Sequence, residues 1–178
     1  MQLFSDLHIS LAGLNDISSL THLLNSAYRG ESSKRGWTTE AHLITGETRS
    51  DEKDLFEIIS MPGSVFLKYT NAEGAITGCV NLQQHGEKIY LGMFSVSPLM
   101  QGGGVGKILL TASEEYALHL SATCIYMSVI SVRTELINWY QRHGYRDTGE
   151  RRPFIEDPLS GKHLLPLEFM ILEKTLIK

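Results

Sequence analysis

The sequence has few of the features that define several large classes of proteins. It contains two cysteines, Cys79 and Cys124, which lack the CxxC spacing of a zinc site and are too few for a disulfide framework. Each has apolar or β-branched neighbours, so we expect two buried free thiols. No apolar run approaches the roughly 20 residues that cross a bilayer. The first residues also lack the basic and apolar segments of a signal peptide. These absences favour a cytoplasmic protein without a membrane partner.

Clustered positive charge is also scarce. The chain has 16 Lys and Arg against 20 Asp and Glu, and its basic doublets are Lys34-Arg35 and Arg151-Arg152. Proteins that bind nucleic acid draw much of their affinity from clustered basic residues, so nucleic acid is not an expected partner. The seven histidines show neither HExxH nor another paired spacing on a helix. We therefore predict no metal site.

What the sequence does have is the composition of an ordinary globular protein. Apolar residues make up 42% and charged residues 20% of 178 residues. This length suits one core, and no repeat or linker divides the chain. We predict a single domain over residues 1–178.

Periodicity predicts alternating strands and helices along this domain. Strands are expected at 7–14, 64–70, 75–84, 88–96, 123–130, 145–149 and 165–176. Helices are expected from Asn15 to Ala27, around 55–60, at 104–120 and at 133–143. The segment 29–50 is expected to be a loop, with a helical turn opening at Trp37.

A glycine cluster lies between the strand at 88–96 and the helix that follows. Pro98 ends the strand, and four glycines occur within Gly102–Gly106. Glycine permits positive φ and lets a ligand approach the backbone closely. The start of a helix offers unpaired N–H groups and the positive end of the helix dipole. The combination predicts a binding site for a pyrophosphate.

Two nucleotide-binding motifs are excluded by counting. A Walker A loop ending at Gly106-Lys107 needs glycine at position 101 and Ser or Thr at 108, where Gln101 and Ile108 stand. A GxGxxG fingerprint from Gly102 or Gly104 needs glycine at 107 or 109, and neither position has one.

The remaining pattern is Gln101-x-x-Gly104-x-Gly106, with Leu91, Phe94 and Val96 upstream. It resembles the signature of the GNAT superfamily of acyl-CoA N-acyltransferases. The segment from Tyr140 to Gly144-Tyr145 resembles the end of that family's second conserved helix. The resemblance implies an α+β fold, with a central twisted mixed sheet of about six to seven strands flanked by about four helices.

The resemblance also implies that acetyl-CoA binds as the acyl donor. Its pantetheine arm would pair with the backbone of Phe94, Ser95 and Val96. Its pyrophosphate would bind the amides of Gln101, Gly102, Gly103, Gly104, Val105, Gly106 and Lys107. Arg133 stands where the family often has asparagine, and either contacts CoA or is exposed to solvent.

The implied reaction is direct attack of a primary amine on the thioester, with a small-molecule or peptide acceptor. Tyr140 is the predicted general acid for the CoA thiolate, although packing on the helix face is an alternative. A general base is harder to identify, since no acidic residue lies between Ile89 and Ser97. Glu168 is the predicted candidate, because Glu87 at the strand's start is remote.

The acceptor is expected to bind the segment that covers this site in the family, through Tyr28, Glu31, Trp37 and Glu40. A capped helix with Trp37 as a hydrophobic staple is the alternative. Because the strand lacks an acid, a non-catalytic CoA-binding or sensor domain is the alternative function. Exposed strand edges in this fold leave a homodimer open.

Overall fold

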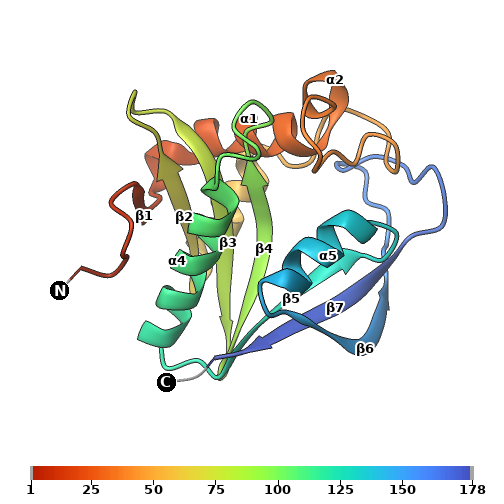
Figure 1. The fold of residues 1–178 in the computed structure, drawn as a ribbon. Helices are drawn as coiled ribbons and strands as arrows, with labels where there is room; N and C mark the ends of the chain where they lie inside the picture. Colours follow the sequence, from red (N-terminus) through yellow and green to blue (C-terminus); the bar gives the residue numbers. More distant parts are fainter. Residues whose placement is uncertain (1, 177–178) are drawn as a thin grey trace.

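The fold is taken from a computed structural model that describes residues 2–176 (Figure 1). A single 3₁₀ turn at Leu14–Asp16 precedes α1. The strands are β1 (Ile9–Leu11), β2 (Ser64–Thr70), β3 (Ile76–His85), β4 (Lys88–Val96), β5 (Cys124–Ile130), β6 (Arg146–Pro153) and β7 (Glu168–Thr175). The helices are α1 (Ile17–Tyr28), α2 (Gly30–Ser33), α3 (Glu52–Ser60), α4 (Val105–His119) and α5 (Thr134–Arg142).

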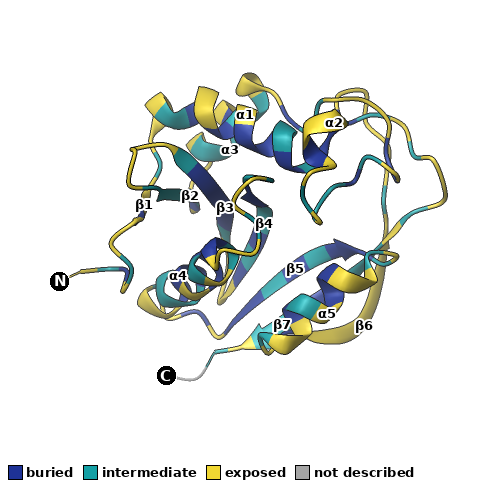
Figure 2. Ribbon diagram, turned by 45° about the horizontal axis from the view of Figure 1, so that its top comes forward, coloured by how far each residue is buried: buried dark blue, intermediate teal, exposed yellow. Residues whose placement is uncertain are grey.

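The seven strands form one mixed sheet in the order β1-β2-β3-β4-β5-β7-β6. All neighbouring pairs are antiparallel except β4 and β5, which run parallel. The predicted mixed sheet of six to seven strands is therefore confirmed. All eight residues of the edge strand β6 are exposed (Figure 2), and pairing of two chains through such an edge stays a prediction.

The central pair of strands separates soon after it forms. β4 and β5 pair only from Lys88–Tyr90 with Cys124–Tyr126, and Figure 1 shows them diverging beyond this point. β4 also carries a bulge, since its pairing with β3 shifts between Cys79 and Asn81 while Met93 adopts a φ of 49°. The second half of β4 thus has one edge free of any strand partner.

Helices cover both faces of the sheet. Buried residues of α4 and α5 share one core with β2–β5 and β7, whereas those of α1 and α3 form a second core with Phe66 and Cys79. Gly78 on β3 permits close packing of α4, because a Cβ there would lie 2.8 Å from Leu109 Cδ1. The predicted buried free thiols, Cys79 and Cys124, are confirmed. Within residues 2–176, no helix has the length and apolar character needed to cross a bilayer.

The segments before α3 and β7 differ from the prediction. The loop 29–50 contains the extra short helix α2, and no helix opens at Trp37. A single helical hydrogen bond forms later, from Ile44 N to Glu40 O at 2.9 Å. The expected strand 165–176 begins only at Glu168, because the chain before it pairs elsewhere, with Leu164 N donating to Leu43 O.

These two segments pack together beside the diverging strands. Ile44 forms an antiparallel bridge with His163, and Leu43 and Ile44 pack with Ile130 and the aromatic side chains of Phe154 and Phe169. The approach is close enough that a Cβ at Gly161, whose φ is +92°, would lie 2.0 Å from Thr45 O. We call these segments, residues 37–45 and 154–167, the roof.

Candidate active site

A cleft of about 580 Å³ lies at the end of β4, between the start of α4 and the outer face of α5. The main chain and side chains from the glycine-rich turn form one wall, and α5 forms the other. The lining residues are Trp37, Thr38, Phe94, Val96, Met100, Gln101, Gly102, Gly104, Gly106, Lys107, Glu135, Leu136, Asn138, Trp139 and Arg142.

The start of α4 presents unpaired amides to this cleft. Gly102 and Gly104 have φ values of +88° and +87°, which a residue with a side chain rarely adopts. Within residues 2–176, no hydrogen bond is donated by the N–H groups of Gly104–Lys107. The positive end of the helix dipole adds to these donors, and Lys107 and Arg142 line the same cleft. The arrangement is suited to a phosphate-bearing ligand.

The side chain of Gln101 is used within the protein. Its Oε1 accepts from Trp37 N at 2.8 Å, and its Nε2 donates to Thr38 Oγ1 at 2.7 Å and to Val96 O at 3.0 Å. The amide therefore joins the roof to the end of β4. Gln101 can offer a ligand its backbone, but its side chain is already hydrogen-bonded.

The carbonyl groups on the free edge of β4 are also occupied. Tyr28 Oη donates to Phe94 O, and Val96 O accepts from Gln101. In an extended strand the N–H of a residue points to the same side as its carbonyl. A ligand that adds to this edge would thus find free N–H donors more readily than free acceptors. Ser95, between these two residues, pairs with Cys79 on the opposite edge of β4, and its hydroxyl is buried.

The α5 wall of the cleft was not predicted from the sequence. Glu135, Asn138, Trp139 and Arg142 line it at spacings of three and four residues, which places them on one face of a helix. Trp139 packs against Phe94 and Trp37 with ring centroids 5.9 Å and 6.4 Å apart. This spacing was available in the sequence and is the signal that could have found them.

A smaller pocket of about 100 Å³ occupies the gap between β4 and β5, below the roof. Its polar lining consists of Tyr28, Glu40, Arg49, Tyr90, Ser128, Arg133 and Tyr140. Its apolar lining includes Met93, Met127, Phe154 and Phe169. Phe94 and Leu136 line both cavities, so the two meet at the free edge of β4.

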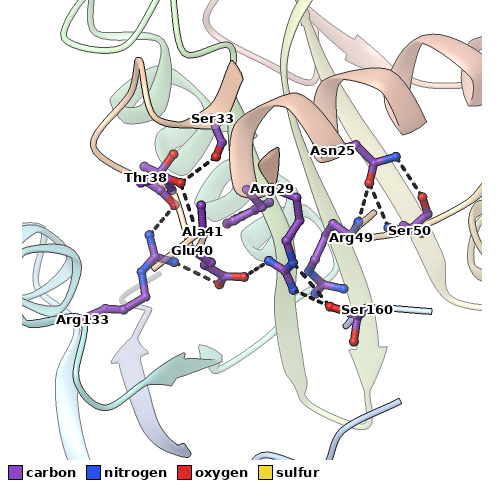
Figure 3. A network of polar contacts seen from close by, with 12 residues as sticks. Asn25, Arg29, Ser33, Thr38, Glu40, Ala41, Arg49, Ser50, Arg133 and Ser160 are labelled. Atoms are coloured by element: carbon purple, nitrogen blue, oxygen red, sulfur yellow. Dashed lines mark hydrogen bonds and ion pairs between the residues drawn. The ribbon is translucent and has the colours of Figure 1, made fainter. Parts of the chain in front are cut away.

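Glu40 lies at the centre of a buried ionic network (Figure 3). Arg29 Nη1 donates to one carboxylate oxygen, and Arg133 Nη1 donates to the other at 3.2 Å. Arg29 also donates to Ser160 O, and Arg133 Nη2 donates to Thr38 O at 2.6 Å. The network joins α1, both segments of the roof and the start of α5, so it holds the smaller pocket closed on one side.

Burial keeps two tyrosines of this pocket protonated. Loss of solvent, followed by the charge of Glu40, raises the pKa of Tyr28 to about 12. Burial likewise raises the pKa of Tyr140 well above its ordinary value of about 10. Both phenols are therefore hydrogen-bond donors at neutral pH.

The predicted site residues separate into those that reach the two cavities and those that do not. Tyr28, Glu40 and Tyr140 line the smaller pocket, whereas Trp37 lines the larger cleft. Arg133 is only 8% exposed and bonds to Glu40, so the predicted exposure is wrong and it lines the smaller pocket rather than the cleft.

The other predicted carboxylates lie outside both cavities. Glu31 is exposed and bonds to Lys34. Glu168 is exposed on β7, next to Phe169, and side chains of successive strand residues point to opposite faces. Since Phe169 lines the pocket, the structure does not bring Glu168 to it. No group of His, Cys, Asp or Glu within residues 2–176 is arranged to hold a metal ion.

Comparison with known proteins agrees with this geometry. Residues 19–145 match the model of the acetyltransferase (GNAT) family. The chain therefore belongs to the GNAT acetyltransferase family. No curated protein sequence matches it significantly.

Solved structures share the fold at low sequence identity. The ribosomal-protein-S18-alanine N-acetyltransferase from Escherichia coli superposes with a TM-score of 0.70 at 16% identity, covering 96% of this chain and 94% of that one. Ribosomal-protein-alanine N-acetyltransferase from Brucella melitensis gives 0.71 at 19% identity, covering 96% and 100%. Ard1 from Thermoplasma volcanium gives 0.71 at 14% identity, covering 96% and 97%.

Proposed function

We propose that this chain is an N-acetyltransferase that transfers an acetyl group from acetyl-CoA to a primary amine of a small molecule or peptide. The observation that carries the proposal is the row of unpaired amides at Gly104–Lys107, which opens onto a cleft that shares Phe94 and Leu136 with a second, smaller pocket. The first cavity suits a diphosphate and the second suits an acceptor. Membership of the family and the similar folds of two ribosomal-protein-alanine N-acetyltransferases support it.

Different residues of the cleft would bind different parts of acetyl-CoA. The amides at the start of α4, with Lys107 and Arg142, would bind its diphosphate. The N–H groups of Phe94 and Val96, on the free edge of β4, would donate hydrogen bonds to carbonyl groups of the pantetheine arm. Trp139 would contact the arm, because it lines the cleft and packs close to both Gly106, where an added Cβ would be 3.5 Å from its ring, and Phe94.

In the reaction the amine nitrogen attacks the thioester carbon, the new C–N bond forms, and the C–S bond breaks. The departing thiolate then needs a proton. Tyr140 lines the smaller pocket, with its ring 6.1 Å from that of Phe94. Because burial keeps its phenol protonated and also makes it a weaker acid than a thiol, we assign Tyr140 as a hydrogen-bond donor to the departing sulfur, whose proton comes in net from the attacking amine.

The amine loses a proton as the amide forms, and this proton ends on the departing sulfur, since the described lining of the pocket has no unpaired carboxylate to keep it. Both oxygens of Glu40 are hydrogen-bonded to guanidinium groups, which makes it a structural group rather than a base. Three arginines lie in or beside the pocket, and their positive charge disfavours an ammonium ion there. A lysine-like amine is neutral only about once in a thousand molecules near pH 7.4, at a cost of about 4 kcal/mol. An acceptor of lower pKa therefore fits better.

The proposal is tested by CoA calorimetry and by CoA release with a panel of amines. We expect CoA to bind and at least one amine to release CoA thiol. Tyr140→Phe should lower kcat by about 100-fold with little change in KM. Tyr116→Phe, in the last turn of α4, is the matched control, because Tyr116 lines neither cavity. It should leave kcat unchanged.

A non-catalytic CoA-binding domain is the second candidate, favoured by the absence of a free carboxylate in the pocket. It predicts CoA binding without release of thiol from any amine. If the protein does not bind CoA at all, both candidates fail.

A further inference from the structure

Arg49 is the one charged residue lining the smaller pocket that has no ion pair within residues 2–176. Glu40 and Arg133 are paired with each other, and Arg29 behind them also pairs with Glu40. Arg49 is held in place through its backbone, whose N–H donates to Asn25 Oδ1. Its guanidinium lies 6.0 Å from the centre of the Tyr28 ring. A half-buried guanidinium with free donors is a strong site for a planar oxyanion.

The charges around the pocket do not neutralise the guanidinium of Arg49. The three guanidinium groups of Arg29, Arg49 and Arg133 face a single carboxylate, that of Glu40. The next carboxylate is Asp157 in the roof, whose pKa is lowered chiefly by its hydrogen bond with Ser160 and slightly by the charge of Arg49. Asp157 accepts from Leu159 N, Ser160 N and Ser160 Oγ, and makes no ion pair with Arg49.

Tyr28 lies between the Arg49 end of the smaller pocket and the free edge of β4, where the reaction would take place. Its ring contacts Arg49, and its hydroxyl bonds to Phe94 O on the free edge of β4. The distance from Arg49 to the edge where acetyl-CoA would lie is therefore spanned by one tyrosine side chain. A ligand that joins both ends must carry its anionic group only a few bonds from its nucleophile.

Resting on the proposed function, we propose that the acceptor is a compact amine that carries a carboxylate close to the amino group, as an amino acid does. Arg49 binds the carboxylate and thereby positions the amine at the edge of β4. A diamine or polyamine would bring further positive charge to a pocket that already has an excess of it. A pocket of about 100 Å³ closed by the roof also favours a compact molecule.

The test compares three acceptors of similar size: an α-amino acid, its carboxamide and a short diamine. The amine of the carboxamide is the weaker base and is more often neutral at pH 7.5, so a preference for the acid cannot arise from basicity. We expect kcat/KM for the acid to exceed that for the amide by about 30-fold, through KM. The diamine should be the poorest of the three.

Variants then assign the preference to one residue. Arg49→Gln should bring acid and amide within about threefold of each other, and Arg49→Lys should retain part of the preference. Arg35→Gln removes the same charge from an exposed position that lines neither cavity, and should leave the preference intact. Unfolding midpoints confirm that all variants are folded.

A binding measurement separates this proposal from the proposed function. The N-acetylated amino acid and its amide are titrated into wild type and Arg49→Gln by calorimetry, without turnover. Tighter binding of the acid that is lost in Arg49→Gln supports the carboxylate site even if no amine is acetylated. Equal binding of acid and amide to the wild type, or a preference that survives in Arg49→Gln, overturns it even if the protein proves to be an acetyltransferase.

Discussion

The two cavities that meet at β4 are built from different parts of the polypeptide. At the start of α4 the cleft presents main-chain amides, which point outward because Gly102 and Gly104 adopt positive φ. The pocket below the roof is built from side chains, with a carboxylate held by two guanidinium groups at its centre. The turn that carries the amides is continuous in sequence, although the roof and α5 complete the cleft, whereas the pocket collects residues from α1, the roof, β7 and α5.

The difference implies that the specificities of the two cavities can change separately. A main-chain site depends on backbone conformation and tolerates many side chains nearby. A side-chain site changes its specificity whenever one of its members is replaced. The two cavities should therefore respond independently to mutation, and three experiments examine this independence.

The largest effect is expected from Glu40→Gln in the side-chain pocket. The change leaves Arg29, which is 1% exposed, and Arg133 without a carboxylate. Breaking a buried ionic network in this way costs about 3–5 kcal/mol of unfolding free energy, which urea titration measures. The affinity for CoA should change by less than about threefold. Glu31→Gln, at an exposed glutamate, is the control and should cost less than about 0.5 kcal/mol. A parallel loss of CoA affinity would show that the cavities are coupled.

The next effect is expected from Gly104→Val in the main-chain cleft. The φ of +87° is strained for valine although nothing lies within 4 Å of the added Cβ, so the start of α4 should rotate away from its present orientation. We expect CoA affinity, measured by calorimetry, to fall by about 30-fold, or about 2 kcal/mol. Gly74→Val repeats the same strain in the β2–β3 turn, where φ is +83°, and should leave CoA affinity unchanged. Equal effects of both variants would mean that strain alone is responsible.

The smallest effect concerns pH and again the side-chain pocket. The pKa of Tyr28 is about 12 in the folded protein and about 10 when unfolded. The protonated phenol therefore stabilises the fold fully below pH 10, and this contribution is lost as pH rises from 10 to 12. At pH 11 the loss is about 1.4 kcal/mol. Tyr28→Phe should show a shallower decline in unfolding free energy over this range. An identical decline in both proteins would place the phenol in solvent.

The cleft could be predicted from the sequence, because its physical basis is local. A proline that ends a strand, a run of glycines and an amphipathic helix are adjacent in the chain, and each has a conformational meaning of its own. The succession of β2, β3 and β4 also follows from alternating patterns and short turns, whereas the place of β7 between β5 and β6 does not. The α5 wall was missed although Glu135 and Trp139 lie at helical spacing.

The smaller pocket could not be predicted in the same way, because its members meet only in three dimensions. Arg49 lies in an irregular segment whose sequence indicates no particular direction for its side chain. Glu168 was favoured because it is a carboxylate on the last strand. Because the roof includes residues up to 167, β7 begins only at Glu168. The alternation of side chains along β7 then directs Phe169, and not Glu168, into the pocket. Tyr140 was predicted as the acid for the thiolate, and Glu40 as a contact of the acceptor, only through resemblance to a family.

The bulge at Met93 determines to which face of the sheet the side chains of β4 point. Before it, Ile89 and Leu91 turn into the core beneath α4; after it, Phe94 and Val96 do so, while Met93 joins the core beneath α1. The odd-numbered residues thus exchange faces with the even-numbered ones within a single strand. Without the bulge, regular alternation of the same residues would direct Ser95 toward α4 and turn Phe94 and Val96 to the opposite face. The bulge therefore places the ring of Phe94 in the cleft and turns the backbone groups of Phe94 and Val96 away from β3.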